Sequence, residues 1–322
     1  MPFRRQHLRY FVTVAQEGQI TRAAAKLHMA QPALSQAIAQ LESELGVGLL
    51  ERQARGVKLT SAGEAFLPKA LAVVDREHEV ELTGQALARA AQGVLALGFV
   101  GPPPTMSIPH LFAAFAADHP DVEIHLRDLS FPRGSTLSWL EEVDVAFCHR
   151  PALEPGVRTQ TVSLEPRGII THRSHPLADR DSLGVADVLD ETFVSYHPDV
   201  QAAWAGFHSL DDHRGKPARL TAARALIPPQ MLAIIASRRA ITTVPASDAD
   251  FILKVLRGVV AIPLHDAHPA VLALVWRNDN HNPLVEALAA IAENLAERRP
   301  LQLWRGAQTD DARRSSERRF RP

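Results

Sequence analysis

Residues 21–46 have the sequence TRAAAKLHMAQPALSQAIAQLESELG, which contains two helix patterns separated by a three-residue break. Alanine, a strong helix former, dominates the first pattern. After His28-Met29-Ala30, the second pattern begins with Pro32 in its first turn, where a missing N–H has no helical partner to lose, and it ends at Gly46, which can cap a helix. Its apolar stripe consists of Leu34, Ile38, Leu41 and Leu45. Two short helices around a tight turn are typical of a helix-turn-helix.

The leading end of the second helix carries side chains that suit base recognition. A helix-turn-helix places this end in the major groove of DNA. Glutamine can pair bidentately with adenine, serine can donate or accept, and the apolar face of proline can touch a thymine methyl group. We therefore assign double-stranded DNA contacts to Gln31, Pro32, Ser35 and Gln36, and to Thr21 and Arg22 at the start of the first helix. The alternative is that Gln31, Ser35 and Gln36 are solvated helix residues without a partner.

A basic segment follows the second helix. Residues 51–60 have the sequence ERQARGVKLT and predict a short hairpin with Gly56 at its tip. The cations of this hairpin, which would contact phosphates or the minor groove, are Arg52, Arg55 and Lys58. An earlier helix that ends at Gly18 is predicted by the spacing of Leu8, Phe11, Val12 and Ala15. Residues 1–60 therefore predict a winged helix-turn-helix domain dominated by helices.

Residues 61–91 predict one long linker helix. It begins with Ser61-Ala62-Gly63-Glu64, a capping-box pattern. Its apolar stripe consists of Leu67, Leu71, Val74, His78 and Leu82. This face can pack on the helix's own domain or on the same helix of a second copy. Because the helix is long and carries a single stripe, we predict a homodimer through it.

Charge is distributed unevenly along a chain whose net charge is −1. Residues 1–60 carry a net charge of +4 and residues 301–322 a net charge of +3, so the intervening body is acidic. A basic end on an acidic body suits a DNA contact followed by a domain that stays off DNA. The tail from residue 301, rich in Arg, Ser and Asp, is expected to be disordered.

From residue 93 onward, strand and helix patterns alternate. The expected strands include VLALGFVG (94–101), VEIHLRDLS (122–130) and VDVAFCHR (143–150), and later GIITHR, FVSYHP, ITTVPA and AVLALVWR. Helices are expected over 108–117, 136–142 and 283–298. This alternation predicts an α/β domain with mostly parallel sheets and a ligand at the carboxyl ends of its strands.

Residues 8–67 resemble the DNA-binding domain of LysR-type transcriptional regulators. The matching pieces are Arg22-Ala23-Ala24, Gln31-Pro32-Ala33-Leu34-Ser35, Leu41-Glu42-x-x-Leu45-Gly46, Leu50-x-Arg52 and Leu59-Thr60-x-Ala62-Gly63. The resemblance extends more loosely to about residue 298, through His175-Pro176-Leu177-Ala178 and Leu274-Val275-Trp276-Arg277.

The resemblance implies an effector-binding domain over 92–300 with two subdomains like those of a periplasmic binding protein. Subdomain I would comprise 92–163 and 267–300, and subdomain II 164–266. It also implies a linker-helix dimer that pairs into a tetramer, an interrupted palindromic operator, RNA polymerase as a further partner, and regulation of a neighbouring operon and of the regulator's own gene.

The chain departs from the family pattern before the two motif helices and near the end of the second subdomain. Gln19 and Ala30 stand where the family commonly places Ser or Thr before the two motif helices. A lost helix cap costs about 1 kcal/mol, so we expect weaker or altered DNA binding. Residues 237–241, SRRAI, replace a Gly-x-Gly-Ile run near the end of the second subdomain.

The effector is expected between the subdomains, against strand ends and helix N-termini, which favour anions. The candidate residues are Thr105, Ser107, Ser130, His149, Arg150, Ser195, Tyr196 and Thr243. Arg150 beside His149 favours a small carboxylate or an amino-acid-like metabolite, although Arg150 could instead pair with a surface acid. The triple proline at 102–104 fills the turn where the family usually presents Ser or Thr.

We expect neither a cofactor nor a metal. His172-x-x-His175 and His265-x-x-His268 have no evident helix or acidic ligands beside them. Cys148, the single cysteine, excludes an internal disulfide and is expected to be an inert buried thiol. The N-terminus lacks the apolar core of a signal peptide, and no stretch could span a bilayer, so we expect a cytoplasmic protein without membrane contact.

Two other interpretations remain open. The triple proline and Arg238-Arg239 leave open a regulator whose effector pocket has degenerated and which acts through protein partners. The chain could also be an α/β binding protein or enzyme with an accessory helical domain. We favour a regulator that is not an enzyme, because the sequence has no Gly-rich phosphate loop and no Gly-x-Ser-x-Gly elbow.

Overall fold

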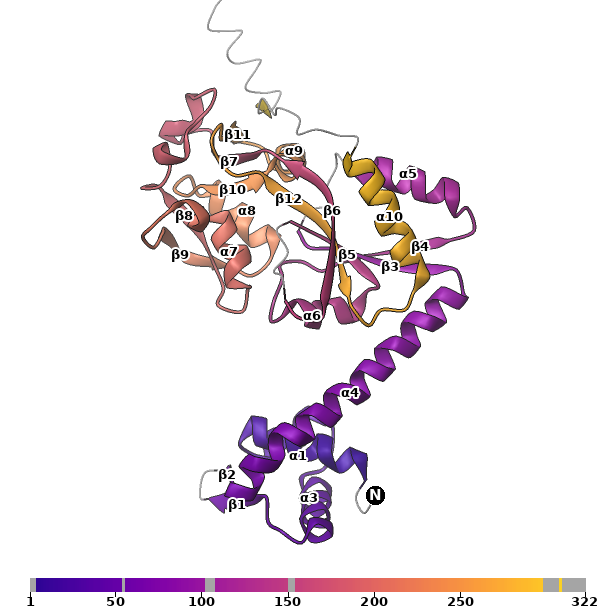
Figure 1. The fold of residues 1–322 in the computed structure, drawn as a ribbon. Coiled ribbons are helices and arrows are strands. Elements are labelled where there is room, and N and C mark those ends of the chain that lie inside the picture. Colours follow the sequence, from indigo (N-terminus) through magenta and orange to yellow (C-terminus); the bar gives the residue numbers. More distant parts are fainter. Residues whose placement is uncertain (1–3, 54–55, 102–107, 150–153, 298–306, 309–322) are drawn as a thin grey trace, which may run out of the picture. The chain divides into compact units, whose positions relative to one another are not determined.

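The computed structural model describes residues 4–53, 56–101, 108–149, 154–297 and 307–308. The chain divides into two compact units, Met1–Gly84 and Gln85–Pro322 (Figure 1). The predicted positions Arg55, Thr105, Ser107 and Arg150, the triple proline at 102–104 and most of the tail lie outside the described residues.

The first unit contains α1 (Arg5–Glu17), α2 (Ile20–Lys26), α3 (Gln31–Leu45), β1 (Leu50–Gln53), β2 (Gly56–Leu59) and most of α4 (Ser61–Ala91). These elements confirm the predicted winged helix-turn-helix. Gly18 and Gly46 end α1 and α3 in the left-handed conformation that glycine adopts without a steric penalty. The stripe of α3 packs into one core with Phe11 of α1, because Leu34, Ile38 and Leu41 are buried.

The predicted stripe of α4 is used mainly inside its own domain. Leu67, Leu71 and Val74 pack against the core of the first unit. A different set of apolar residues on α4 is exposed, namely Val73, Val80 and Leu87. These three recur every seven residues, the spacing that keeps side chains on one face of a helix that pairs with another helix.

The second unit contains a five-stranded sheet in the order β4-β3-β5-β12-β6. Its strands are β3 (Val94–Phe99), β4 (Glu123–Asp128), β5 (Val145–His149), β6 (Val157–Glu165) and β12 (Ala270–Arg277). Helices α5 (Ile108–Asp118) and α10 (Pro283–Glu297) pack side by side against this sheet, with the short α6 (Thr136–Trp139) and η1 (Leu140–Glu142) between β4 and β5 (Figure 1). We call this part subdomain I.

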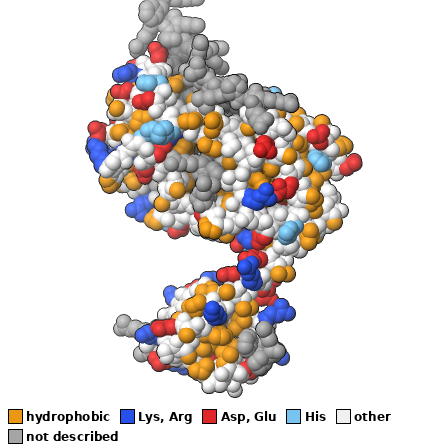
Figure 2. All heavy atoms as spheres, viewed as in Figure 1, with side chains coloured by type: hydrophobic (Ala, Val, Ile, Leu, Met, Phe, Trp, Pro, Cys, Tyr) orange, Lys and Arg blue, Asp and Glu red, His pale blue; other side chains and the backbone are white. Residues whose placement is uncertain are grey.

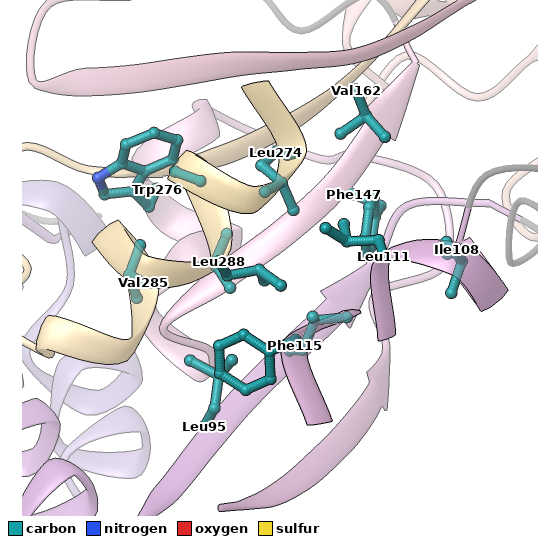
Figure 3. Packing of buried hydrophobic residues seen from close by; sticks show 14 of the residues in the cluster. Leu95, Ile108, Leu111, Phe115, Phe147, Val162, Leu274, Trp276, Val285 and Leu288 are labelled. Atoms are coloured by element: carbon teal, nitrogen blue, oxygen red, sulfur yellow. The ribbon is translucent and has the colours of Figure 1, made fainter. Parts of the chain in front are cut away.

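The core of subdomain I lies between the sheet and these two helices. Phe147 and Leu274 from the sheet meet Phe115 of α5 and Leu288 of α10 (Figure 3). These side chains are at most 1% exposed. Both β3 and β5 are fully buried, as central strands covered by helices are.

Subdomain II contains a second sheet in the order β10-β7-β11-β13 and a separate pair of strands, β8 and β9. These strands are β7 (Arg167–His172), β8 (Thr192–Tyr196), β9 (Arg219–Ala225), β10 (Thr242–Pro245), β11 (Val259–Pro263) and β13 (Ala307–Gln308). Its helices are α7 (Ala202–His208), α8 (Pro228–Ala236) and α9 (Ala246–Val255), with short turns η2 (Pro176–Asp179), η3 (Val185–Asp187) and η4 (Asp211–His213).

The expectation of mostly parallel sheets is wrong. Among the described strands, β4-β3-β5 and β8-β9 pair in parallel, whereas every pairing within the second sheet and both pairings of β12 are antiparallel. The cause is the path of the chain between the subdomains. The chain leaves subdomain I along β6 and returns along β12, which lies beside β6 in the opposite direction. We call the two connections, residues 165–167 and 264–269, the hinge.

The departure from the family's glycine run has a visible backbone consequence. Arg238 stands at the first glycine of that run and has φ of 76°. A residue with a β-carbon pays roughly 1–2 kcal/mol in this left-handed region. The chain therefore keeps the backbone conformation that glycine would favour and carries the strain.

Candidate DNA interface and ligand cleft

The leading end of α3 presents the predicted base-reading side chains to solvent. Gln31, Pro32 and Gln36 are exposed and Ser35 is half-buried. The side-chain amide of Gln31 donates to the hydroxyl of Ser35 at 3.3 Å, so the two polar groups are held together on one face. Buried Leu34, between them in sequence, anchors this face from behind.

Both motif helices begin without a side-chain cap. Ala30 precedes α3 with extended backbone angles, and Gln19 precedes α2 in the same way; neither side chain accepts a hydrogen bond from the helix that follows. This confirms the predicted loss of caps. The first N–H groups of α3 have no side-chain cap from Ala30, and such groups at a helix N-terminus favour an anion such as a phosphate.

Thr21 and Arg22 lie exposed on the first turn of α2. The guanidinium of Arg22 donates to the main-chain carbonyl of Glu17 at the end of α1. The side chain of Glu17 accepts from Lys26 at 2.9 Å, and this contact, with the Coulombic attraction of Lys26, lowers the pKa of Glu17. Arg22 remains 61% exposed, so it can still meet a phosphate.

The hairpin is held on the helices by contacts that the sequence did not reveal. Glu42 of α3 accepts hydrogen bonds from the backbone N–H groups of Leu49 and Leu50, at 2.6 and 2.9 Å. Gly56 lies so close to the main chain of Gly18 that an added β-carbon would sit 2.3 Å from its carbonyl oxygen. The sequence signal that could have indicated this contact is the presence of two glycines, Gly18 where α1 ends and Gly56 at the tip of the hairpin.

The described cations of the hairpin point to opposite faces. In the register of the two strands, Lys58 lies opposite Glu51 and Arg52 lies opposite Val57. Successive residues of a strand alternate between faces, so Arg52 and Lys58 cannot both face the same phosphate group. Figure 2 shows basic and acidic side chains interspersed over one face of both units, so positive charge is not gathered into one large field on that face.

A cleft of about 660 Å³ lies between the two subdomains of the second unit. It opens at the carboxyl ends of β3 and β4 and is closed on the other side by the start of α8 and by α9, as the strand-end rule predicts. The residues that line it are Phe99, Gly101, Leu126, Arg127, Asp128, Ser130, Ile227, Pro228, Pro229, Leu232 and Phe251.

Most of the cleft wall is apolar. Leu126 is 58% exposed, although it stands in a strand, because its side chain faces this space. Pro228 and Pro229 occupy the first turn of α8, and because proline has no N–H, that helix start offers fewer donors to an anion. The polar part of the described wall comes from Arg127, Asp128 and Ser130.

Of the effector residues predicted from sequence, Ser130 lines the cleft, whereas His149, Ser195, Tyr196 and Thr243 do not appear among its described lining residues. Ser195 and Thr243 are buried in subdomain II, and Tyr196 is partly buried there. The hydroxyl of Tyr196 lies 3.3 Å from the hydroxyl of Thr242, and the Thr243 hydroxyl donates to the carbonyl of His208 at 2.9 Å. Ser195, Tyr196 and Thr243 do lie in strands β8 and β10, but their side chains are taken up by packing and hydrogen bonds inside subdomain II.

His149 belongs to a buried ionic cluster at the joint between the subdomains. Its Nε2 lies 3.7 Å from Oε2 of Glu165, at the end of β6, and its Nδ1 lies 3.9 Å from Oδ1 of Asp248, in α9 of subdomain II. The backbone N–H of Ser247 donates to Glu165 at 3.2 Å. All three titratable side chains are at most 8% exposed.

Burial and charge act on these groups in opposite directions. Burial raises the pKa of Asp248 to about 7 despite the attraction of His149. Burial alone would lower the pKa of His149, but the carboxylates of Asp248 and Glu165 outweigh it and raise that pKa. The pKa of Glu165 is lowered, because the nearby His149 imidazole and the hydrogen bond from Ser247 outweigh its burial. A His149–Glu165 ion pair therefore stands beside a carboxyl group that titrates near neutral pH.

The remaining sequence candidates have ordinary structural partners. Burial raises the pKa of Cys148 to about 12, so its thiol is unreactive near neutral pH. The Nδ1 atoms of His172 and His175 contact Ser174 and the backbone of Leu177. Among the described helices, none is long and apolar enough to cross a membrane.

Known proteins resemble the chain over both units. Residues 5–64 match the family described as "Bacterial regulatory helix-turn-helix protein, lysR family", and residues 88–296 match the "LysR substrate binding domain". The HTH-type transcriptional regulator AlsR of Bacillus subtilis (strain 168) is 32% identical over 288 residues, which cover 87% of this chain and 92% of AlsR.

Two solved full-length structures are similar along nearly their whole length. Full-length BenM is 26% identical with a TM-score of 0.50, over 93% of this chain and 99% of BenM. Full-length CbnR, solved in complex with its target DNA, is 24% identical with a TM-score of 0.50, over 91% of this chain and 99% of CbnR. The CbnR match shows a shared fold.

Proposed function

The chain belongs to the LysR family of bacterial transcriptional regulators, which are DNA-binding proteins and not enzymes, and on that premise we propose that α3 reads an operator while the cleft controls this binding through a small molecule. One observation carries the proposal. The polar leading end of α3 is exposed, whereas the opposite face of the same helix is buried in a stable core.

We assign base reading to Gln31, Pro32, Ser35 and Gln36 of α3, which share its exposed leading end. Thr21 and Arg22 on α2 and Arg52, Arg55 and Lys58 on the hairpin are assigned to the phosphate backbone or the minor groove. Because Arg52 and Lys58 lie on opposite faces of the hairpin, we expect them to contact two different parts of the DNA backbone.

The effector we propose is a small carboxylate or amino-acid-like metabolite with an apolar portion. The apolar wall formed by Phe99, Leu232 and Phe251 suits the apolar portion. Arg127 supplies a cation for the carboxylate, a task for which the proline-bearing start of α8 is less suited.

The active assembly we propose is a cytoplasmic homodimer, which pairs into a tetramer. The exposed stripe of Val73, Val80 and Leu87 supports a helix partner for α4. A twofold dimer presents two copies of α3, so its operator would be an interrupted palindrome whose half-sites are separated by about one helical turn of DNA or a multiple of it.

DNA recognition is tested by selecting bound sequences from a random double-stranded DNA pool with the full-length protein. The expected outcome is an enriched interrupted palindrome, bound with an affinity that falls steeply as salt concentration rises, because phosphate contacts release counterions. Enrichment of no sequence, or binding that does not depend on salt, would overturn the proposal.

Dimerisation is tested by analytical ultracentrifugation of Val80→Glu, since Val80 is 72% exposed in the single chain. A buried glutamate in a helix–helix interface should shift the protein toward monomer. Gln85→Glu places the same charge on an exposed position of α4 outside the stripe and should leave the assembly unchanged. Equal sedimentation of the two variants would contradict dimerisation through this face.

The effector is tested by a thermal-shift screen of carboxylates and amino acids. A ligand that binds only the folded state raises the melting temperature. Arg127→Gln should abolish the shift, whereas Arg180→Gln, an exposed arginine of subdomain II outside the cleft, should retain it. If no compound shifts the wild-type protein, the alternative of a degenerate pocket that acts through protein partners gains support.

A further inference from the structure

Three side chains that can bind a metal ion meet at the surface of subdomain II, beside the hinge. Asp212 and His213 belong to η4, and His268 belongs to the hinge segment between β11 and β12. Nε2 of His213 lies 3.6 Å from Oδ2 of Asp212, and Nδ1 of His268 lies 3.8 Å from the same oxygen. One potential ligand atom from each of the three residues lies within 4.8 Å of the others.

The two separations that involve Asp212 are close to those of a tetrahedral site. Zinc binds imidazole nitrogen and carboxylate oxygen at roughly 2.0–2.2 Å, which places neighbouring ligand atoms about 3.4 Å apart. The two measured separations from Asp212 exceed this value by a few tenths of an ångström, within reach of side-chain rotation. Two imidazoles and one carboxylate favour zinc-type transition-metal ions over magnesium or calcium, which prefer oxygen ligands.

The carboxylate at the centre of the group is held in place by a buried cation. Nη1 of Arg167 lies 3.1 Å from Oδ2 and 3.4 Å from Oδ1 of Asp212, and the Arg167 side chain is fully buried. The guanidinium fixes the orientation of the carboxylate, as outer-shell partners of metal ligands do. The Asp212 side chain is 10% exposed, so it remains accessible from the side of the two histidines.

The two histidines approach each other without a packing requirement. Their rings lie 4.3 Å apart, and the His268 side chain is 73% exposed, so the core does not force it into this position. The backbone N–H of His268 donates to Nε2 of His213 at 3.2 Å. A metal ion that used this nitrogen would replace one neutral hydrogen bond with a coordinate bond.

We propose that Asp212, His213 and His268 bind one zinc-type divalent transition-metal ion, with a water molecule completing the coordination. The site would connect both parts of the hinge. His268 stands in the connection from β11 to β12, and Asp212 is paired with Arg167, the last residue of the connection from β6 to β7. Bound metal would therefore stiffen the joint on which opening of the cleft depends.

The proposal is tested with full-length protein that carries no polyhistidine tag and has been dialysed against a chelator. Isothermal titration with zinc chloride near neutral pH should show one equivalent bound by the wild type. Loss of an outer-shell partner alone lowers metal affinity by about 10- to 100-fold, so His268→Ala, which removes a ligand, should lower it at least as much.

His265→Ala is the matched control, because His265 lies in the same hinge segment but contacts Ser182 instead of the cluster. It should bind zinc as the wild type does. His213→Gln is the second ligand variant, and thermal unfolding without metal establishes that each variant is folded. Titration with cobalt(II) should produce the visible bands of tetrahedral coordination in the wild type and not in the ligand variants. Absence of zinc binding by the wild type, or equal binding by all variants, would overturn the proposal.

Discussion

The DNA-reading end of α3 and the cleft of the second unit differ in where their residues come from. The proposed DNA contacts all lie within residues 21–58, and the base-reading residues share one helix. The lining of the cleft is drawn from positions between 99 and 251, in strands and helices of both subdomains. A surface built from one continuous segment can be identified by spacing, whereas a surface built from distant segments depends on how the chain folds back.

The two regions also differ in how function relates to stability. Gln31, Pro32 and Gln36 are exposed, so their replacement should leave the fold intact. Phe99 lines the cleft and is 7% exposed, and it also belongs to the core of subdomain I. We therefore expect DNA recognition to be separable from folding, and ligand recognition to be coupled to it.

The largest effect is expected at Phe99. Its ring is stacked on Phe147 with centroids 5.6 Å apart, so Phe99→Ala should lower the free energy of unfolding by about 3–5 kcal/mol. Urea unfolding measures the change. Gln36→Ala, at an exposed position of α3, should stay within about 0.5 kcal/mol of the wild type. Similar losses of unfolding free energy in the two variants would contradict the proposed difference between the two regions.

The next effect concerns Asp248 and depends on pH. Its pKa is about 7 in the folded protein and 3.8 in its ordinary state, so the unfolded chain loses this proton first and folding becomes less favourable as pH rises from about 4 to 7. Asp248→Asn removes this penalty. It also removes part of the upward shift in the pKa of His149, a shift that likewise makes folding less favourable as pH rises. The stability advantage of the variant over the wild type should grow by about 3 kcal/mol between pH 4.5 and pH 8, at about 1.4 kcal/mol for each pH unit up to the folded pKa.

Thermal unfolding at several pH values measures this difference. Besides Glu165 within the cluster, His208 interacts with His149, and burial lowers the pKa of His208 to about 3, so His208 stays neutral in the folded protein over this range. An advantage of the variant that shrinks as pH rises would contradict the assignment.

A smaller effect is expected for single DNA contacts. Gln31→Ala should lose about 1–3 kcal/mol of discrimination at one operator base pair, whereas Arg52→Ala should weaken binding to all sequences alike and reduce the salt slope by about 1. Fluorescence anisotropy with operator and scrambled duplexes separates the two. Identical behaviour of the two variants would mean that the division into base reading and phosphate binding is wrong.

The smallest effect is expected at the uncapped start of α3. Ala30→Ser supplies an oxygen for the free N–H groups and should raise the free energy of unfolding by about 1 kcal/mol or less. Ala39→Ser, at an exposed position inside the same helix, offers no cap and should be slightly destabilising. Thermal unfolding of both variants measures the two effects. If Ala39→Ser also stabilised the protein, helix capping would not be the cause of the gain in Ala30→Ser.

The sequence was sufficient to predict the helices and strands whose residue pattern is local. The helices α1 to α4, the basic hairpin and the strands β3 and β5 were predictable from apolar spacing and glycine positions. It did not reveal that β12 lies antiparallel between β5 and β6, because that order depends on the chain crossing the hinge twice.

The same limit applies to the candidate sites. Ser195 and Thr243 were predicted at strand ends, but only the register of the folded sheet shows that their side chains face the core. The pairing of His213 with His268 joins residues more than fifty positions apart, so no spacing rule could identify it.

Site-specific photo-crosslinking from Gln36 tests the central claim most directly. A photoreactive amino acid at position 36 should crosslink to bases of the selected operator half-site, because we propose that the leading end of α3 inserts into the major groove. The same group at Gln92, an exposed position in the second unit, should not crosslink to bases. Specific operator binding by the labelled protein without any crosslink from position 36 would contradict the account.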